Sequence, residues 1–129
     1  MNRRLVLAAA LALAPRLGHA QDQRKQGGGE SFIQMETLDA TVTRADGQRG
    51  VMTIDAGLDV PDAGLRARAR ASMPLLLSAF GDVARTYAAG LPPGAVPNAD
   101  YLSFELQRQT DRILGRPGAH LLLGTILVN

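Results

Sequence analysis

The strongest constraint on the fold is a pair of alternating segments joined by a short polar turn. Apolar side chains occupy every second position in residues 38–43, and a similar alternation returns in residues 51–60. Such alternation predicts two strands that each bury one face. The Asp46-Gly47 pair between them is a hairpin signal, because glycine accepts the positive φ of tight hairpin turns. The two segments therefore predict an antiparallel hairpin.

The hairpin register follows from the positions of the apolar residues. The two apolar sets are Leu38, Ala40 and Val42, and Met52, Ile54, Leu58 and Val60. All are even-numbered, so paired positions must sum to an even number if both sets are to face the same side. A two-residue turn would give an odd sum, and we therefore expect a turn at residues 45–47 with Gly47 left-handed. Ile33 and Met35 break the alternation, which predicts a bulge or strand start near Glu36.

The residues after the hairpin show helical periodicity. The second strand is followed by Asp62, which can cap a helix. Apolar residues then recur every three or four positions over residues 65–87, which predicts an amphipathic helical region. Pro74 interrupts this region, so that the helix either kinks there or ends near Ala71 and restarts with Ser72 as its cap.

The remaining residues predict one more helix and a closing strand. A stiff loop at residues 90–97 precedes a helical run that Asn98 can cap and Gly115 can end. Residues 120–128 are almost all apolar, which predicts a strand covered on most sides. The expected fold is α+β, with two or three helices on one face of a three-stranded sheet. A right-handed crossover would make the closing strand parallel to the second strand, and pairing with the first strand would place the first strand centrally.

The start of the chain has the pattern of an export signal. Arg3 and Arg4 precede a short apolar run, and small residues stand at the −3 and −1 positions of a cleavage site that ends at Ala20. The paired arginines favour the twin-arginine pathway, with a general secretory signal as the alternative. The apolar run at residues 5–14 is too short to span a bilayer. We therefore expect cleavage before Gln21 and a periplasmic product without an integral membrane segment.

The rest of the chain is nearly neutral. Residues 21–31 are polar and contain three consecutive glycines, so we expect a flexible linker before a single domain at residues 32–129. Without the three arginines of residues 1–20, eleven of the fourteen basic residues remain against twelve acidic residues. This balance argues against a nucleic-acid partner. The sequence has no cysteine, which excludes disulfides and thiol chemistry.

Three carboxylates, those of Asp39, Asp55 and Asp59, share the predicted open face of the hairpin. Carboxylates can perform acid–base chemistry or hold a divalent cation. A solvated sheet face also needs polar residues, and the aspartates do not have the spacing of a calcium-binding loop. We therefore expect no metal and no other cofactor, and we retain the three aspartates as possible interaction residues.

Arg66 and Arg70 lie on one side of the predicted first helix and are possible contacts for an anion or a partner. Pairing of Arg66 with Asp62, four residues earlier, would instead make this an ordinary solvated face. His120 is the only histidine outside residues 1–20, and no serine lies in a GxSxG turn, so the sequence presents no hydrolase arrangement. We expect no catalytic residue and no enzymatic activity.

Several of these segments resemble the periplasmic domain of the flagellar basal-body-associated FliL family. The resemblance rests on DGQRGVMTIDAGLDV at residues 46–60, Pro74 followed by three leucines, TDRIL at residues 110–114 and the closing apolar strand. It implies a fold similar to the stomatin/prohibitin-type domain and association, as an oligomer, with the flagellar motor stator. FliL-type proteins keep an uncleaved membrane helix, whereas this chain has the pattern of a cleavable signal and also resembles small alphaproteobacterial twin-arginine-pathway signal proteins.

Two functional hypotheses follow from the sequence. The first is an exported, non-catalytic domain that acts through protein binding or self-association, using sheet edges or helix faces. The alternative is a periplasmic protein that binds a small molecule or a metal ion, through the aspartate face or a groove beside the helices.

Overall fold

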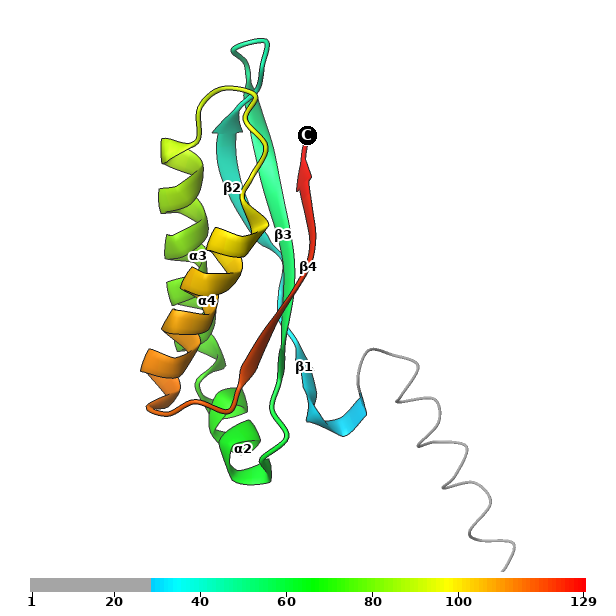
Figure 1. The fold of residues 1–129 in the computed structure, drawn as a ribbon, viewed down its shortest axis with the longest axis vertical. Helices are drawn as coiled ribbons and strands as arrows, with labels where there is room; N and C mark the ends of the chain where they lie inside the picture. Colours follow the sequence, from blue (N-terminus) through cyan, green and yellow to red (C-terminus); the bar gives the residue numbers. More distant parts are fainter. Residues whose placement is uncertain (1–28) are drawn as a thin grey trace, which may run out of the picture.

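The computed structural model describes residues 29–129 (Figure 1). The predicted signal, with Arg3, Arg4 and Ala20, lies outside the described residues, as does most of the predicted linker. The last residues of that linker form a short 3-10 helix, η1 (Gly29–Ser31). The elements that follow are β1 (Phe32–Gln34), β2 (Leu38–Thr43), β3 (Arg49–Asp59), α2 (Ala63–Ala71), α3 (Met73–Gly90), α4 (Ala99–Leu114) and β4 (His120–Val128). The predicted α+β class is confirmed, with helices packed against an antiparallel sheet.

The long strand β3 lies at the centre of the sheet. β1 and β2 lie end to end along one of its edges, with Gln34 opposite Gly57 and Leu38 opposite Ile54. The break between β1 and β2 falls at the irregularity predicted near Glu36, and it divides the expected first strand in two, so that the sheet has four strands. β4 lies along the other edge of β3.

The expectations of a central first strand and of a parallel closing strand are both wrong, because β3 is central and β4 runs antiparallel to it. The physical reason is the path of the chain between these strands. α3 runs back along the sheet and α4 returns beside it, so that the chain arrives again at the end where β3 finished (Figure 1). From there β4 can only run against β3.

The β2–β3 turn confirms the register predicted from the apolar positions. The N–H of Arg44 donates to the carbonyl of Gln48 at 2.8 Å, and residues 45–47 form the turn. Gly47 has a φ of 82°, in the left-handed region that favours glycine. Along β2, buried and exposed side chains alternate without exception, as the sequence predicts.

The helix boundaries coincide with the predicted caps. The carboxylate of Asp62 accepts the N–H of Leu65 at 2.8 Å and starts α2. The side-chain carbonyl of Asn98 accepts the N–H of Tyr101 at 3.0 Å and starts α4. Gly115, with a φ of 82°, ends α4 in the left-handed conformation.

At Pro74 the chain adopts the second of the two predicted alternatives. α2 ends at Ala71, and α3 begins at Met73 with Pro74 in its first turn, where the missing N–H of proline costs no helical hydrogen bond. Ser72 separates the helices, but its side chain makes no capping hydrogen bond. The proline therefore starts a helix and does not bend one.

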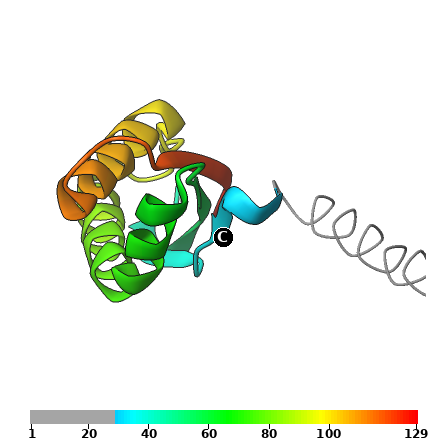
Figure 2. The same cartoon turned by 90° about the horizontal axis from the view of Figure 1, so that it is seen from below.

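The core fills the space between the sheet and the helices, which lie on one side of it (Figure 2). Its largest fully buried side chains include Phe80, Met52, Ile54, Leu58, Leu65, Leu76, Leu102, Leu106 and Leu114. Thr110 is buried among them, and its hydroxyl donates to the carbonyl of Leu106 at 2.8 Å. Within residues 29–129, no helix combines the length and apolarity needed to cross a membrane.

β4 is less covered than its apolar sequence predicts. Leu121, Leu123 and Ile126 pair with inward-facing residues of β3 and pack against the core. Leu122 and Leu127 occupy the intervening positions on the opposite face of the sheet, where they are 48% and 53% exposed. The prediction of a strand covered on most sides is wrong, because the helices pack against only one face of the sheet.

Candidate functional site

The structure places Asp39, Asp55 and Asp59 on the open face of the sheet, as predicted, but at separate points along it. Each accepts a hydrogen bond, at 2.6–3.0 Å, from a different side chain: Thr53 for Asp39, Gln34 for Asp55 and Ser31 for Asp59. Among residues 29–129 no group of three or more His, Cys, Asp or Glu side chains is placed to hold a metal ion. The three carboxylates therefore form no common centre.

His120 lies directly opposite Asp59 at the start of β4. The hydroxyl of Ser31 donates to the Asp59 carboxylate at 2.6 Å. In a serine hydrolase the histidine stands between the hydroxyl and the carboxylate, so that it can take the proton of the nucleophile. Here the hydroxyl bonds the carboxylate directly, which is not the geometry of an activated nucleophile.

Arg66 has a structural role at the β3–α2 turn. Its guanidinium donates to the carbonyl of Val60 at 3.0 Å. The expected pairing with Asp62 is wrong, because Asp62 forms its ion pair with Arg116, at 3.0 Å. Arg70 is exposed on α2, and a partner contact there stays a prediction.

The environment of Asp62 favours its charged form. The N–H of Leu65 and, after it, the guanidinium of Arg116 hold the pKa of the Asp62 carboxyl below its usual range. Arg116 follows α4 in the chain, so this ion pair links the start of α2 to the end of α4.

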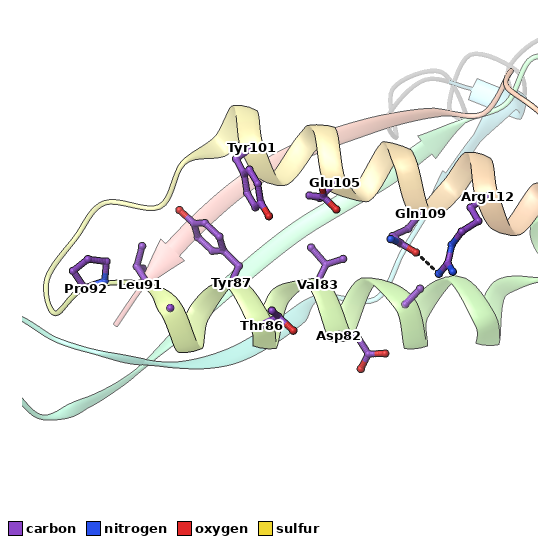
Figure 3. A pocket seen from close by; sticks show the side chains of 12 residues that line it. Asp82, Val83, Thr86, Tyr87, Leu91, Pro92, Tyr101, Glu105, Gln109 and Arg112 are labelled. Carbon is purple, nitrogen blue, oxygen red and sulfur yellow. Dashed lines mark hydrogen bonds between the residues drawn. The ribbon is translucent and has the colours of Figure 1, made fainter.

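A groove of about 630 Å³ lies between α3 and α4 (Figure 3). Tyr87 of α3 and Tyr101 of α4 stack at one end of it, with ring centroids 5.5 Å apart and planes at 26°. The Tyr87 hydroxyl accepts the N–H of Asn98 at 2.7 Å, so that it also fixes the start of α4. Glu105 and Arg112 line the wall along α4 (Figure 3).

Sequence reasoning did not identify the residues of this groove. Tyr87 falls within the apolar periodicity of residues 65–87, and Tyr101 falls within the helical run that Asn98 caps. The sequence does contain a signal for this stack: one aromatic residue lies near the end of a helix and another near the start of the next helix. If the two helices pack antiparallel, these two residues come side by side. The walls mix apolar and charged groups, and such a surface suits a small molecule with both.

A second surface missed from the sequence surrounds the last residues of β4. It holds four of the eight large apolar side chains that are exposed in residues 29–129, and we call it the β4 edge patch: Val51, Val96, Leu127 and Val128, exposed by 45%, 88%, 53% and 44%. Val96 and Val128 line one cavity of about 400 Å³ under the loop before α4. Val51 and Leu127 lie diagonally on the open face of the sheet. The patch therefore reaches both faces of the sheet around its edge.

The backbone of β4 presents hydrogen-bonding groups along the same edge. Val51 and Asn129 exchange both backbone hydrogen bonds, each at 3.0 Å. Because bonded and non-bonded pairs alternate in antiparallel sheets, the backbone groups of Ile126 and Val128 point away from β3. In the described part of the chain, no other strand pairs with this side of β4.

Helix α4 covers the opposite end of this edge. The side-chain amide of Gln107 accepts the N–H of Leu121 and donates to the carbonyl of Ala119, both at 2.8 Å. An irregularity in the β3–β4 register follows, with an extra β4 residue between the partners of Ile54 and Ala56. The accessible edge is therefore confined to the last few residues of the strand.

Comparison with known proteins gives no family. No family model matches the chain, and no curated protein matches it. The resemblance to FliL-type domains stays a prediction, and the function is argued from the geometry of the chain itself.

Proposed function

We propose that this chain is an exported, non-catalytic domain that acts by binding protein through the free edge of β4. The observation that carries the proposal is the β4 edge patch, in which exposed apolar side chains surround backbone groups that point away from the sheet. Clustered apolar side chains on a surface mark sites of protein interaction. A sheet edge with accessible backbone groups accepts a further strand, whose main chain supplies the hydrogen bonds.

The charges around the two edges of the sheet support the choice of β4. The β2 edge carries Asp39 within the strand itself. Charged side chains beside an edge discourage the approach of another strand. β4 has no charged residue among its last eight, LLLGTILV.

Export is the part of the proposal that depends on the sequence alone. If the twin-arginine pattern is functional, the protein in the periplasm begins at Gln21. N-terminal sequencing of the protein from the periplasmic fraction tests this, and a cytosolic product that retains Met1 contradicts it.

Site-specific photo-crosslinking tests the binding surface. A photoreactive residue in place of Leu127 should give covalent adducts in the periplasmic fraction. The same residue in place of Ser78, which is exposed on α3, is the matched control and should give none. Equal labelling from both positions, or no adduct from position 127, contradicts the proposal.

The α3–α4 groove favours a second candidate function, the binding of a small molecule. Its volume of about 630 Å³ lies within the range of known ligand pockets. A ligand that binds the folded state raises the midpoint of thermal unfolding by mass action. In a screen of periplasmic metabolites, at least one compound should raise the unfolding midpoint, and Tyr101→Ala should abolish this increase. A midpoint that no compound changes contradicts this function.

A further inference from the structure

We infer that the partner of the β4 edge is a second copy of this chain, bound by antiparallel pairing of β4 with its two-fold-related equivalent. The inference rests on the proposed function, because it uses the same edge. It adds the identity of the partner and the register of the contact.

Symmetry is the first reason for a second copy. When two identical strands pair about a two-fold axis, each side chain at the axis meets its own equivalent. A charged residue there would meet like charge, which is destabilising between directly opposed strand residues. The last eight residues of β4 are uncharged and satisfy this condition, whereas β2, which lies with β1 along the other edge, contains Asp39.

The free backbone groups determine the register. The groups of Ile126 and Val128 point outward, because those of Asn129 are bonded to Val51. An antiparallel neighbour must place its own outward-pointing residues opposite these. Among the registers that meet this rule and avoid the β4 irregularity, the one that pairs both outward-pointing residues sets Ile126 of each copy opposite Val128 of the other. Leu127 then lies on the two-fold axis.

The side chains agree with this register. Leu127 is on the open face of the sheet and 53% exposed, so that two copies bring the two leucines together on that face. Val51 lies diagonal to Leu127 on β3 and continues the apolar surface behind it, while Val128 faces the other side of the sheet, where it lines one cavity with Val96. The contact thus removes Leu127 and Val128 from water, two of the apolar side chains that the isolated domain leaves exposed.

Gln107 sets the limit of the contact. Its amide already bonds the outward N–H of Leu121, so a neighbouring strand cannot use that end of β4. The pairing is consequently short and lies at one end of the sheet. Leu122, which shares the open face with Leu127, is five residues from the axis. Its equivalents in the two copies would be separated by about 30 Å, ten residues of extended strand.

Single cysteines test this register in the full-length exported protein, which has no cysteine of its own. In Leu127→Cys the opposed Cα atoms of a non-hydrogen-bonded pair are about 4.5 Å apart. That separation lies within the range of about 4.4–6.8 Å that a disulfide needs. Oxidation with copper phenanthroline should convert most of this variant to a covalent dimer. Leu122→Cys has comparable exposure and should stay monomeric, and equal cross-linking of the two variants overturns the inference.

Sedimentation equilibrium provides the independent readout. The unmodified protein should approach twice the monomer mass as its concentration rises, and Leu127→Asp should lose this association while its circular dichroism is unchanged. A strictly monomeric wild-type protein overturns the inference. If photo-crosslinking from position 127 still captures another protein, the proposed function stands without the second copy. If it captures nothing, both fail.

Discussion

The side-chain amide of Gln107 takes the place of a neighbouring strand at Leu121. Its oxygen accepts the N–H of Leu121 at 2.8 Å, and its nitrogen donates to the carbonyl of Ala119 at the same distance. One residue of α4 therefore supplies both kinds of bond that a strand would offer. This contact joins the helical layer to the sheet at the point where β4 begins.

Replacement of this amide should destabilise the domain. Gln107→Ala leaves a partly buried N–H and carbonyl without their partner, and we expect the free energy of unfolding to fall by about 1–3 kcal/mol. Gln109→Ala, which removes an amide bonded to the exposed Arg112, should change it by less than about 0.5 kcal/mol. Urea denaturation measures the unfolding free energy of both variants. Equal losses would contradict a larger contribution from the Gln107 contact.

Asp62→Asn should remove one source of pH dependence from the free energy of unfolding. It should keep the cap of α2, because asparagine caps helices as well as aspartate does. The folded state lowers the pKa of Asp62 through the N–H of Leu65 and the charge of Arg116. The ionised carboxylate therefore stabilises the fold above the ordinary aspartate pKa of about 3.9, and this contribution is lost as the pH falls through the lowered pKa. The difference in unfolding free energy between wild type and variant should shrink as the pH falls through the lowered pKa, and a difference that is constant with pH contradicts the prediction.

Tyr87→Phe should loosen the connection between α3 and α4. The substitution keeps the aromatic stack but removes the hydroxyl that accepts the N–H of Asn98 at 2.7 Å. We expect a loss of about 0.5–1.5 kcal/mol in unfolding free energy and faster amide exchange at Asn98. Tyr101→Phe is the matched control, since it preserves both the stack and the Tyr87 hydroxyl. An equal loss in the control would refute the assignment.

Gly57→Ala should displace β1. Gly57 lies under the ring of Phe32, and a Cβ at this position would overlap that ring. We expect the free energy of unfolding to fall by about 1–3 kcal/mol, as for other overpacked sites. The amide of Ile33 should also be less protected from hydrogen exchange. In a Phe32→Ala background the same substitution should cost much less, because the two residues interact directly. Additive effects in the double-mutant cycle would contradict the contact.

The features that the sequence predicted correctly are local ones. The register of the hairpin depends on the apolar positions of its two strands and on Gly47 in its turn, all of which belong to one continuous stretch of chain. The caps at Asp62 and Asn98 depend on a side chain and a backbone N–H three residues later. Such contacts form wherever the segment folds, so that the sequence alone specifies them.

The incorrect predictions concern contacts between distant segments. Arg66 was expected to pair with Asp62, but Arg116, 54 residues from Asp62, competes for the same carboxylate. Nothing within β4 indicates its direction or partner strand, which depend on the antiparallel course of α3 and α4. An apolar run of this length is equally compatible with a buried strand and with an edge strand whose open face carries leucines.

The same distinction separates the predicted from the unpredicted surfaces. The alternation of β2 and β3 was sufficient to place Asp39, Asp55 and Asp59 on the open face. The groove and the β4 edge patch each combine side chains from elements that meet only in the folded chain, such as Val51 and Val128. The periodicity of one segment does not show which other segments it will contact in the folded chain.

The pairing of β3 with β4 also has a consequence for biosynthesis. Asp59 pairs with His120, 61 residues later, and Met52 with Val128, 76 residues later. Contacts between such distant positions form slowly, because a long loop must close first. While the ribosome is still translating the helices, the nascent β3 has a hairpin partner on one side and bare hydrogen-bonding groups on the other. Chaperones that bind extended apolar segments therefore have their best opportunity in the interval before the final strand emerges.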